Sequence, residues 1–216
     1  MNDRRIAAFA LTVMMLAGCA SLAPPPSALA ACAQGVCNAA DLPALHDDLA
    51  EPSIAVDPVN PQFLAAVVEF KPVPQRETAL FTSHDGGLTW TRASFSATSV
   101  FSDVSDVIVL FTATGTLLVI GSGIRSDPIN PDGTMEIWLS RSQDGMSFSP
   151  IQFLPHATSL QPVRGRHAIG AAAGADGTIL VTFSEPVPAP AGPIWRQDPY
   201  FTVSNDDGVT WSNTRP

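Results

Sequence analysis

Charged residues are scarce in this sequence, and basic residues are the scarcer kind. Only 14% of the 216 residues are charged, with 11 lysines and arginines against 20 acidic residues. Binding to nucleic acid needs a basic surface that neutralises phosphates, so we expect no nucleic-acid partner. The 20 prolines, 15 glycines and 45% hydrophobic residues are instead typical of a turn-rich β protein with a core.

Patterns that usually bind cofactors or activate nucleophiles are missing as well. The chain has no glycine-rich phosphate-binding loop and no Gly-x-Ser-x-Gly sequence. Its histidines are scattered and show no metal-ligand spacing; they are His46, His84, His156 and His167. We therefore expect no metal and no cofactor.

An apolar run, residues 6–17, follows a short basic segment at the N-terminus. It is too short for a membrane-spanning helix, which needs about 20 residues, and is typical of a signal peptide. The run leads into Leu16-Ala17-Gly18-Cys19, which resembles a bacterial lipobox. Cleavage before Cys19 predicts a lipoprotein signal peptide over residues 1–18 and a membrane anchor through lipid on Cys19.

Two other processing sites compete with Cys19. An ordinary secreted protein would be cut after Ala30, and a second lipobox-like string ends in Cys32. Both lie beyond the prolines at 24–26 and far from the apolar run, so we favour Cys19. Ala20 after the lipidated cysteine predicts the outer membrane of a bacterial cell envelope, if sorting follows the enteric type.

Residues 19–48 are rich in alanine and proline, and we expect them to tether a folded domain, residues 49–216, to the membrane. Within this tether, Cys32 and Cys37 are spaced to close a small loop. Export to an oxidising compartment favours a disulfide between them over two free thiols.

One short pattern, Ser-x-Asp-x-Gly-x-Thr-Trp, occurs twice and returns between these copies in a degenerate form. The central copy lacks one residue between its aspartate and its glycine, and has Ser-Phe in place of Thr-Trp. Repeats about 60 residues apart, each between β-prone runs, predict the blades of a β-propeller. The defining residues are Ser83, Asp85, Gly87, Thr89 and Trp90; Ser142, Asp144, Gly145 and Phe148; and Ser204, Asp206, Gly208, Thr210 and Trp211.

Each residue type in this pattern has a role in a tight turn. The aspartate accepts hydrogen bonds from backbone N–H groups, and the glycine adopts a positive φ. The hydroxyl groups add local hydrogen bonds, while the indole buries a large apolar surface. We therefore expect Asp85, Asp144 and Asp206 to be structural and not catalytic.

These residues resemble the Asp-box, or BNR repeat, of sialidase-like propellers. The resemblance implies an all-β fold of four-stranded blades, with the Asp-box turns at the rim and away from the active site. It implies no reaction, because the family includes proteins without enzymatic activity. A sialidase would need an arginine triad, an aspartate acid/base and a tyrosine nucleophile. The chain has no Arg-Ile-Pro sequence, and its single tyrosine, Tyr200, precedes an Asp-box, where we expect it to pack.

Three rounds of β-prone segments accompany the Asp-boxes. The innermost strands are expected at 54–56, 108–110 and 169–171, the second strands at 63–70, 117–120 and 179–183, and the third at 78–82, 136–140 and 200–203. Antiparallel alternation places the short turns and the Asp-boxes at one end of the strands. The long connections 71–77, 121–135 and 184–199 then lie at the other end, where binding residues usually gather.

The starts of the inner strands supply the candidate binding residues. Aligning the inner isoleucines puts Glu51, Ser105 and Arg166 in one register, and Pro52, Asp106 and His167 in the next. We expect an axial pocket there, in which a tryptophan of the rim stacks on a sugar ring. The alternative is a simple ion pair between Arg166 and Asp106. The ligand-binding candidates are Glu51, Asp106, Arg166, His167, Trp195 and Arg196, with Lys71, Arg76 and Arg125 at the rim.

The sequence predicts three blades, whereas a closed propeller has at least four and a propeller of the sialidase-like group usually has six. We favour a fragment of a longer protein over a homodimer that completes the ring. The predicted function is binding of a glycan or another envelope ligand by a lipid-anchored propeller, and no residue pattern names a catalyst. One alternative is an exo-sialidase or other glycoside hydrolase whose remaining catalytic residues are missing from this chain. Another is a protein-binding scaffold for envelope assembly.

Overall fold

A computed structural model of the chain describes residues 49–70, 77–95, 97, 99–125, 133–155, 167–188 and 195–214. The chain divides into two units, Met1–Asp41 and Leu42–Pro216, and all described residues lie in the second unit. The predicted signal peptide, Cys19, the tether with Cys32 and Cys37, and Arg166 therefore lie outside the described residues. Among the residues that are described, no helix is long and apolar enough to cross a membrane.

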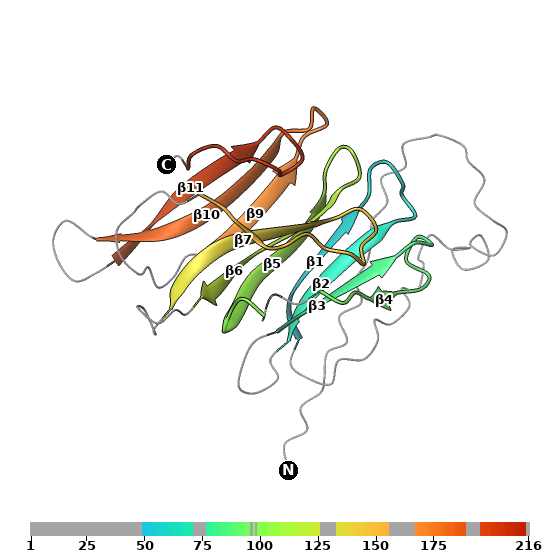
Figure 1. Cartoon of the computed structure of the whole chain (residues 1–216), viewed down its shortest axis with the longest axis horizontal. Helices are drawn as coiled ribbons and strands as arrows, with labels where there is room; N and C mark the ends of the chain where they lie inside the picture. Colours follow the sequence, from blue (N-terminus) through green and yellow to red (C-terminus); the bar gives the residue numbers. More distant parts are fainter. Residues whose placement is uncertain are drawn as a thin grey trace, which may run out of the picture. The chain divides into compact units, whose positions relative to one another are not determined.

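The described residues form three antiparallel sheets (Figure 1). The first contains β1 (Leu49–Val56), β2 (Leu64–Phe70), β3 (Glu77–Ser83) and β4 (Thr91–Arg92) in that order. The second contains β5 (Asp103–Phe111), β6 (Leu117–Arg125), β7 (Thr134–Ser142) and β8 (Gln152–Phe153). The third contains β9 (His167–Ala173), β10 (Ile179–Pro188) and β11 (Trp195–Ser204).

Apart from Phe63, which precedes β2, the predicted strands lie within the observed ones, and the three long strands of each sheet pair as an up-and-down meander. The predicted connections 121–135 and 184–199 are too long, because paired strands extend into them: β6 and β10 end at Arg125 and Pro188, and β7 and β11 begin at Thr134 and Trp195. The outer strands β4 and β8 are only two residues long. In the third sheet, the described residues after the Asp-box form no fourth strand. They nevertheless run beside β11, because the Ser212 N–H donates to the Val203 carbonyl at 2.8 Å.

The inner strands β1, β5 and β9 lie next to one another, as the cartoon also shows (Figure 1). Each carries a β-bulge near its start, where the register with the second strand shifts. Glu51 and Asp106 occupy the bulges of β1 and β5, with φ angles of 50° and 54°. These two residues are therefore equivalent, and the alignment on inner isoleucines, which paired Glu51 with Ser105, is wrong by one residue.

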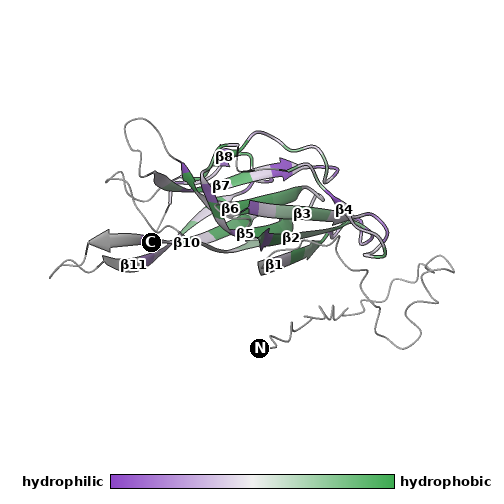
Figure 2. Cartoon of the chain, turned by 90° about the horizontal axis from the view of Figure 1, so that it is seen from below, coloured by the Kyte–Doolittle hydropathy of each residue, from purple (hydrophilic) through white to green (hydrophobic). Residues whose placement is uncertain are grey.

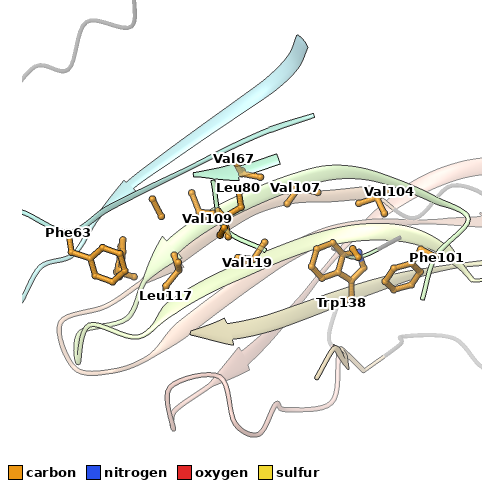
Figure 3. Close-up of a cluster of buried hydrophobic side chains, with 14 residues drawn as sticks. Phe63, Val67, Leu80, Phe101, Val104, Val107, Val109, Leu117, Val119 and Trp138 are labelled. Atoms are coloured by element: carbon orange, nitrogen blue, oxygen red, sulfur yellow. The ribbon is translucent and has the colours of Figure 1, made fainter. Parts of the chain in front are cut away.

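Two apolar clusters join the sheets. The first lies between the first and second sheets and includes Phe63, Val67 and Trp138 (Figure 3). The second lies between the second and third sheets and includes Leu118 and Phe183. In agreement with this, the middle of β5 and β6 is coloured as hydrophobic in Figure 2. Burial of these apolar faces is the main force that holds consecutive sheets together.

Two glycines on β6 make room for aromatic rings. A Cβ atom at Gly121 would lie 2.7 Å from the Trp138 ring, and one at Gly123 would lie 2.6 Å from the Phe101 ring. Trp138 is fully buried and stacks on Phe101 with ring centroids 5.8 Å apart. The second strand of the second sheet thus needs small residues where an aromatic side chain covers its backbone.

Candidate functional site

The first Asp-box turn is held by its own side chains. The Ser83 hydroxyl donates to Asp85 Oδ1 at 2.8 Å, and the Thr89 N–H donates to the same oxygen at 2.8 Å. The Thr89 hydroxyl donates to Asp85 Oδ2 at 2.5 Å. The Trp90 indole N–H folds back and donates to the Gly87 carbonyl at 3.2 Å. All these contacts lie within the turn.

The third sheet repeats this turn. Asp206 accepts from the backbone and hydroxyl of Thr210 at 2.8 and 2.6 Å, and from Ser204 at 2.8 Å. The hydrogen bonds from Thr210 lower the pKa of Asp206 to about 2. Trp211 donates to the Gly208 carbonyl at 3.1 Å. A carboxylate held this firmly in its charged form is a poor proton donor at neutral pH.

The central turn keeps the aspartate contacts but not the indole. Asp144 accepts from the Met146 and Ser147 N–H groups at 2.8 and 2.7 Å, and these bonds lower its pKa. Phe148 packs against Phe95 instead, with ring centroids 4.9 Å apart. The three aspartates therefore take part in the turns as the sequence predicted.

The Asp-box turns and the first turns of the sheets lie at one end of the strands, as strand alternation predicted. In the first sheet, the Gly86 N–H of the Asp-box donates to the Gln62 carbonyl of the β1–β2 turn at 3.0 Å. In the second, the Gln143 amide donates to the Thr116 hydroxyl at 2.8 Å. The bulged starts of β1 and β5 lie at the opposite end of the strands.

Three carboxyl groups gather at this opposite end. Glu51 and Asp106 belong to the two bulges, and Glu69 lies on β2, one residue before its end. Glu69 is buried with an exposed fraction of 3%, and its Oε1 accepts the Val107 N–H at 3.1 Å. Since Val107 is the second residue of the β5 bulge, this bond links the first sheet to the second. We call Glu51, Glu69 and Asp106 the acidic cluster.

The protonation of Glu69 is unusual. Burial raises the pKa of its carboxyl group to about 7, against the opposing effect of the Val107 N–H. The negative charges of Glu51 and Asp106 and a hydrogen bond with Glu51 raise it further. Near neutral pH, Glu69 therefore exchanges a proton beside other carboxyl groups, which is a property of groups that donate or accept protons in binding and catalysis.

Hydroxyl groups surround the rest of the cluster. The Ser122 hydroxyl donates to Asp106 Oδ2 at 3.1 Å and lies 2.9 Å from the Ser105 hydroxyl. Thr78 of β3 is paired with Glu69 of β2, and its buried hydroxyl has no hydrogen-bond partner within the described part of the chain. Positive φ angles at two acidic residues are costly for side chains with a Cβ atom, and such backbone strain often occurs at functional sites.

The structure brings together two of the predicted binding residues, Glu51 and Asp106. His167 is the first residue of β9. Trp195 and Arg196 are the first residues of β11, where they pair with Pro188 and Val187 of β10. For these three candidates the structure describes the strand position and not the side chain.

Among the rim candidates, Lys71 and Arg76 lie outside the described residues. Arg125 forms an ion pair with Glu136 at 3.4 Å and covers the Phe153 ring at 4.9 Å. Tyr200 stacks on Phe183 with ring centroids 6.4 Å apart, in agreement with the predicted packing role.

Sequence reasoning missed Glu69. The available signal was a single acidic residue in the run Leu-Ala-Ala-Val-Val-Glu-Phe of β2, whose other members are all apolar. A charged residue inside a buried strand needs a specific partner, which makes it a candidate for function. Among the described residues, no group of three or more histidine, cysteine, aspartate or glutamate side chains is placed to hold a metal ion.

No protein-family model matches the sequence, and no curated protein matches it. A solved protein of unknown function from Dyadobacter fermentans is similar in structure, with a TM-score of 0.59 and 18% identity over 77% of this chain and 54% of its own. An α-L-arabinanase of Penicillium chrysogenum solved with arabinobiose has a TM-score of 0.49 and 14% identity, over 75% of this chain and 49% of its own. A Hadza microbial sialidase has a TM-score of 0.44 and 12% identity, over 78% and 45%.

The chain therefore spans about half the length of these solved structures. At such low identity the likeness concerns the fold alone. The three antiparallel sheets, their Asp-box turns and this likeness in fold define an all-β protein of the β-propeller type, of which three blades are described.

Proposed function

We propose that this chain is a lipid-anchored propeller protein of the bacterial cell envelope that binds a glycan at the acidic cluster. The carrying observation is the convergence of Glu51, Glu69 and Asp106 from two neighbouring sheets at the end opposite the Asp-boxes. Carboxylates accept hydrogen bonds from sugar hydroxyls, and a carboxyl group that keeps its proton near neutral pH also donates one. A sugar presents both kinds of group.

A second candidate function, glycoside hydrolysis, is favoured by one specific observation. Glu69 has a pKa raised to about 7, chiefly by burial, and it lies in the acidic cluster. Retaining and inverting glycosidases both use one protonated and one ionised carboxyl group, whose environments separate their pKa values. In this reading Glu69 would give its proton to the leaving oxygen as the glycosidic bond breaks, while a water molecule attacks the anomeric carbon and releases its own proton to solvent.

Binding is tested by immobilised glycans and by calorimetry with the hits. The variants Glu69→Gln and Asp106→Asn each remove one member of the acidic cluster while keeping its shape. We expect each to weaken binding at least about tenfold, which corresponds to about 1.4 kcal/mol. Asp176→Asn is the matched control, because it removes a carboxylate from the turn at the other end of the strands.

The outcomes separate the candidate functions. Equal binding by the wild type, both cluster variants and the control would refute glycan binding at the acidic cluster. Hydrolysis would be established if the wild type released the aryl group from arabinofuranosyl or N-acetylneuraminyl aryl glycosides and the Glu69→Gln variant did not. If the immobilised chain captured another envelope protein and bound no glycan, the alternative function of a protein-binding scaffold for envelope assembly would be favoured. Thermal unfolding of each variant shows whether a loss reflects misfolding.

A further inference from the structure

A hollow of about 530 Å³ lies at the end of the strands that carries the Asp-box turns, between the second and third sheets. This volume falls within the range of small-ligand pockets, about 300–1,000 Å³. It is distinct from the acidic cluster, which lies at the opposite end of the strands. Its lining includes Thr116, Arg141, Gln143, Asp144, Asp207 and Val209.

The central Asp-box forms one wall of the hollow, and this turn differs from the other two. It is one residue shorter than they are, and has Phe148 where they have tryptophan. In the first and third turns an indole folds back onto the turn's glycine carbonyl. Phe148 packs against Phe95 between the first and second sheets instead, so the central turn has no indole folded against it.

Arg141 is the cation of this hollow. It lies near the end of β7, and its Nε atom is buried and has no hydrogen-bond partner among the described residues. Arg141 also forms no ion pair with any residue that the structure describes. The guanidinium carries five N–H donors, and Arg141 lines the hollow, so a ligand oxygen there would meet the donors other than the buried Nε–H.

Carboxylates form the rest of the polar wall. Asp207 stands at a φ of 55°, where the first turn has Gly86, and its Oδ2 accepts the Thr114 hydroxyl at 2.6 Å. Asp144 and Asp206 line the same hollow. Three negative charges against one positive charge disfavour an anion, while the donors of the Arg141 guanidinium need acceptor oxygens. An uncharged ligand with hydroxyl groups meets both conditions, because each hydroxyl accepts and donates.

We propose that this hollow is a second binding site, and that it takes a neutral saccharide through Arg141 and Asp207. Arg141 donates to a hydroxyl or ring oxygen of the sugar, and Asp207 accepts from a neighbouring hydroxyl. The exposed side chain of Val209 offers an apolar contact for the sugar's C–H groups. The site does not depend on the acidic cluster, so its test can succeed where glycan binding at the cluster fails.

The test is a titration of the ¹⁵N-labelled full chain with arabinobiose, maltose and N-acetylneuraminic acid, followed by NMR. We expect a neutral disaccharide to shift the Arg141 Nε–H signal and the Gln143 side-chain amide signal. Arg141→Gln should weaken this binding at least about tenfold, which corresponds to loss of one strong hydrogen bond. Arg92→Gln is the matched control, because Arg92 lies on β4 over the Phe70 ring.

Three results would overturn the proposal. The first is an unchanged Arg141 Nε–H signal at tens of millimolar of both neutral disaccharides. The second is a shift caused by N-acetylneuraminic acid alone, which would make the hollow an anion site. The third is loss of the disaccharide response in Glu69→Gln with retention in Arg141→Gln, which would place the binding at the acidic cluster.

Discussion

Glu69 is a carboxylic acid inside an otherwise apolar strand, and its surroundings explain why the fold tolerates it. One carboxyl oxygen accepts the Val107 N–H, and burial together with nearby negative charge keeps the proton on the group up to a pH of about 7. A neutral buried carboxyl is far less costly than an ionised one. The residue thus combines a structural bond between two sheets with a proton that is released near neutral pH.

The first prediction concerns the pH dependence of folding. The pKa of Glu69 is raised from 4.5 to about 7 in the folded chain, so the folded state binds this proton more tightly than the unfolded state. The resulting stability is complete below pH of about 4.5 and is lost as the pH rises through 7, by at most about 1.4 kcal/mol per pH unit. In Glu69→Gln this loss should disappear.

Urea unfolding of the wild type and of Glu69→Gln at pH 5, 6, 7 and 8 measures the difference. The glutamine keeps an oxygen that can accept the Val107 N–H, so the variant should fold. Parallel pH profiles for the two proteins would show that Glu69 does not hold its proton in the folded state.

At the scale of the elements, the long strands could be predicted because apolar and β-branched residues alternate with turn signals. The bulges of β1 and β5 could not be predicted in this way. A bulge inserts a residue without changing residue types, and it depends on the register of two paired strands. This is why Glu51 and Asp106 were both recognised as candidates but assigned to different registers. Glu69 was not predicted as a site residue because its hydrogen-bond partner, the Val107 N–H, belongs to a strand that is distant in the sequence.

The second prediction concerns the close contact between β6 and the Trp138 ring. Gly121→Ala would place a Cβ atom 2.7 Å from this ring, which is fully buried and has little space to move. We expect a loss of about 1–3 kcal/mol in the free energy of unfolding, as for other overpacked cores. Gly170→Ala on β9 is the control, because its nearest neighbour, Thr182 Oγ1, lies 3.5 Å away.

Chemical denaturation of the two variants and of the wild type gives these free energies. An equal effect of both substitutions would mean that the cost comes from replacing glycine in a strand and not from the contact with Trp138.

At the scale of the whole molecule, the Asp-box spacing was sufficient to predict the fold class, because every residue in that turn has a local role in folding. Ligand and activity could not be predicted in the same way. A cluster of carboxyl groups has no sequence signature, as its members come from β1, β2 and β5. The membrane anchor depends on residues 1–19, outside the described part of the chain, and stays a prediction from the lipobox.

The third prediction therefore addresses the anchor. Cys19→Ser removes the thiol that would receive lipid, so the variant should leave the membrane fraction and appear in the soluble fraction of the envelope. Fractionation of cells that produce either protein, followed by immunoblotting, measures this. Signal-peptide cleavage and membrane attachment that persist in the serine variant would contradict the lipobox assignment.

The glycine of an Asp-box also takes part in the joint between sheets. A Cβ atom at Gly145 would lie 2.6 Å from Thr82 and 3.0 Å from the Phe63 ring of the first sheet, and one at Gly208 would lie 3.5 Å from Leu118 of the second. The second sheet thus carries both halves of the joint: its Asp-box turn packs on the first sheet, and its Leu118 side chain packs against the turn of the third. A substitution at Gly145 or Gly208 would therefore disturb two sheets at once, the one that carries the turn and the one on which the turn packs.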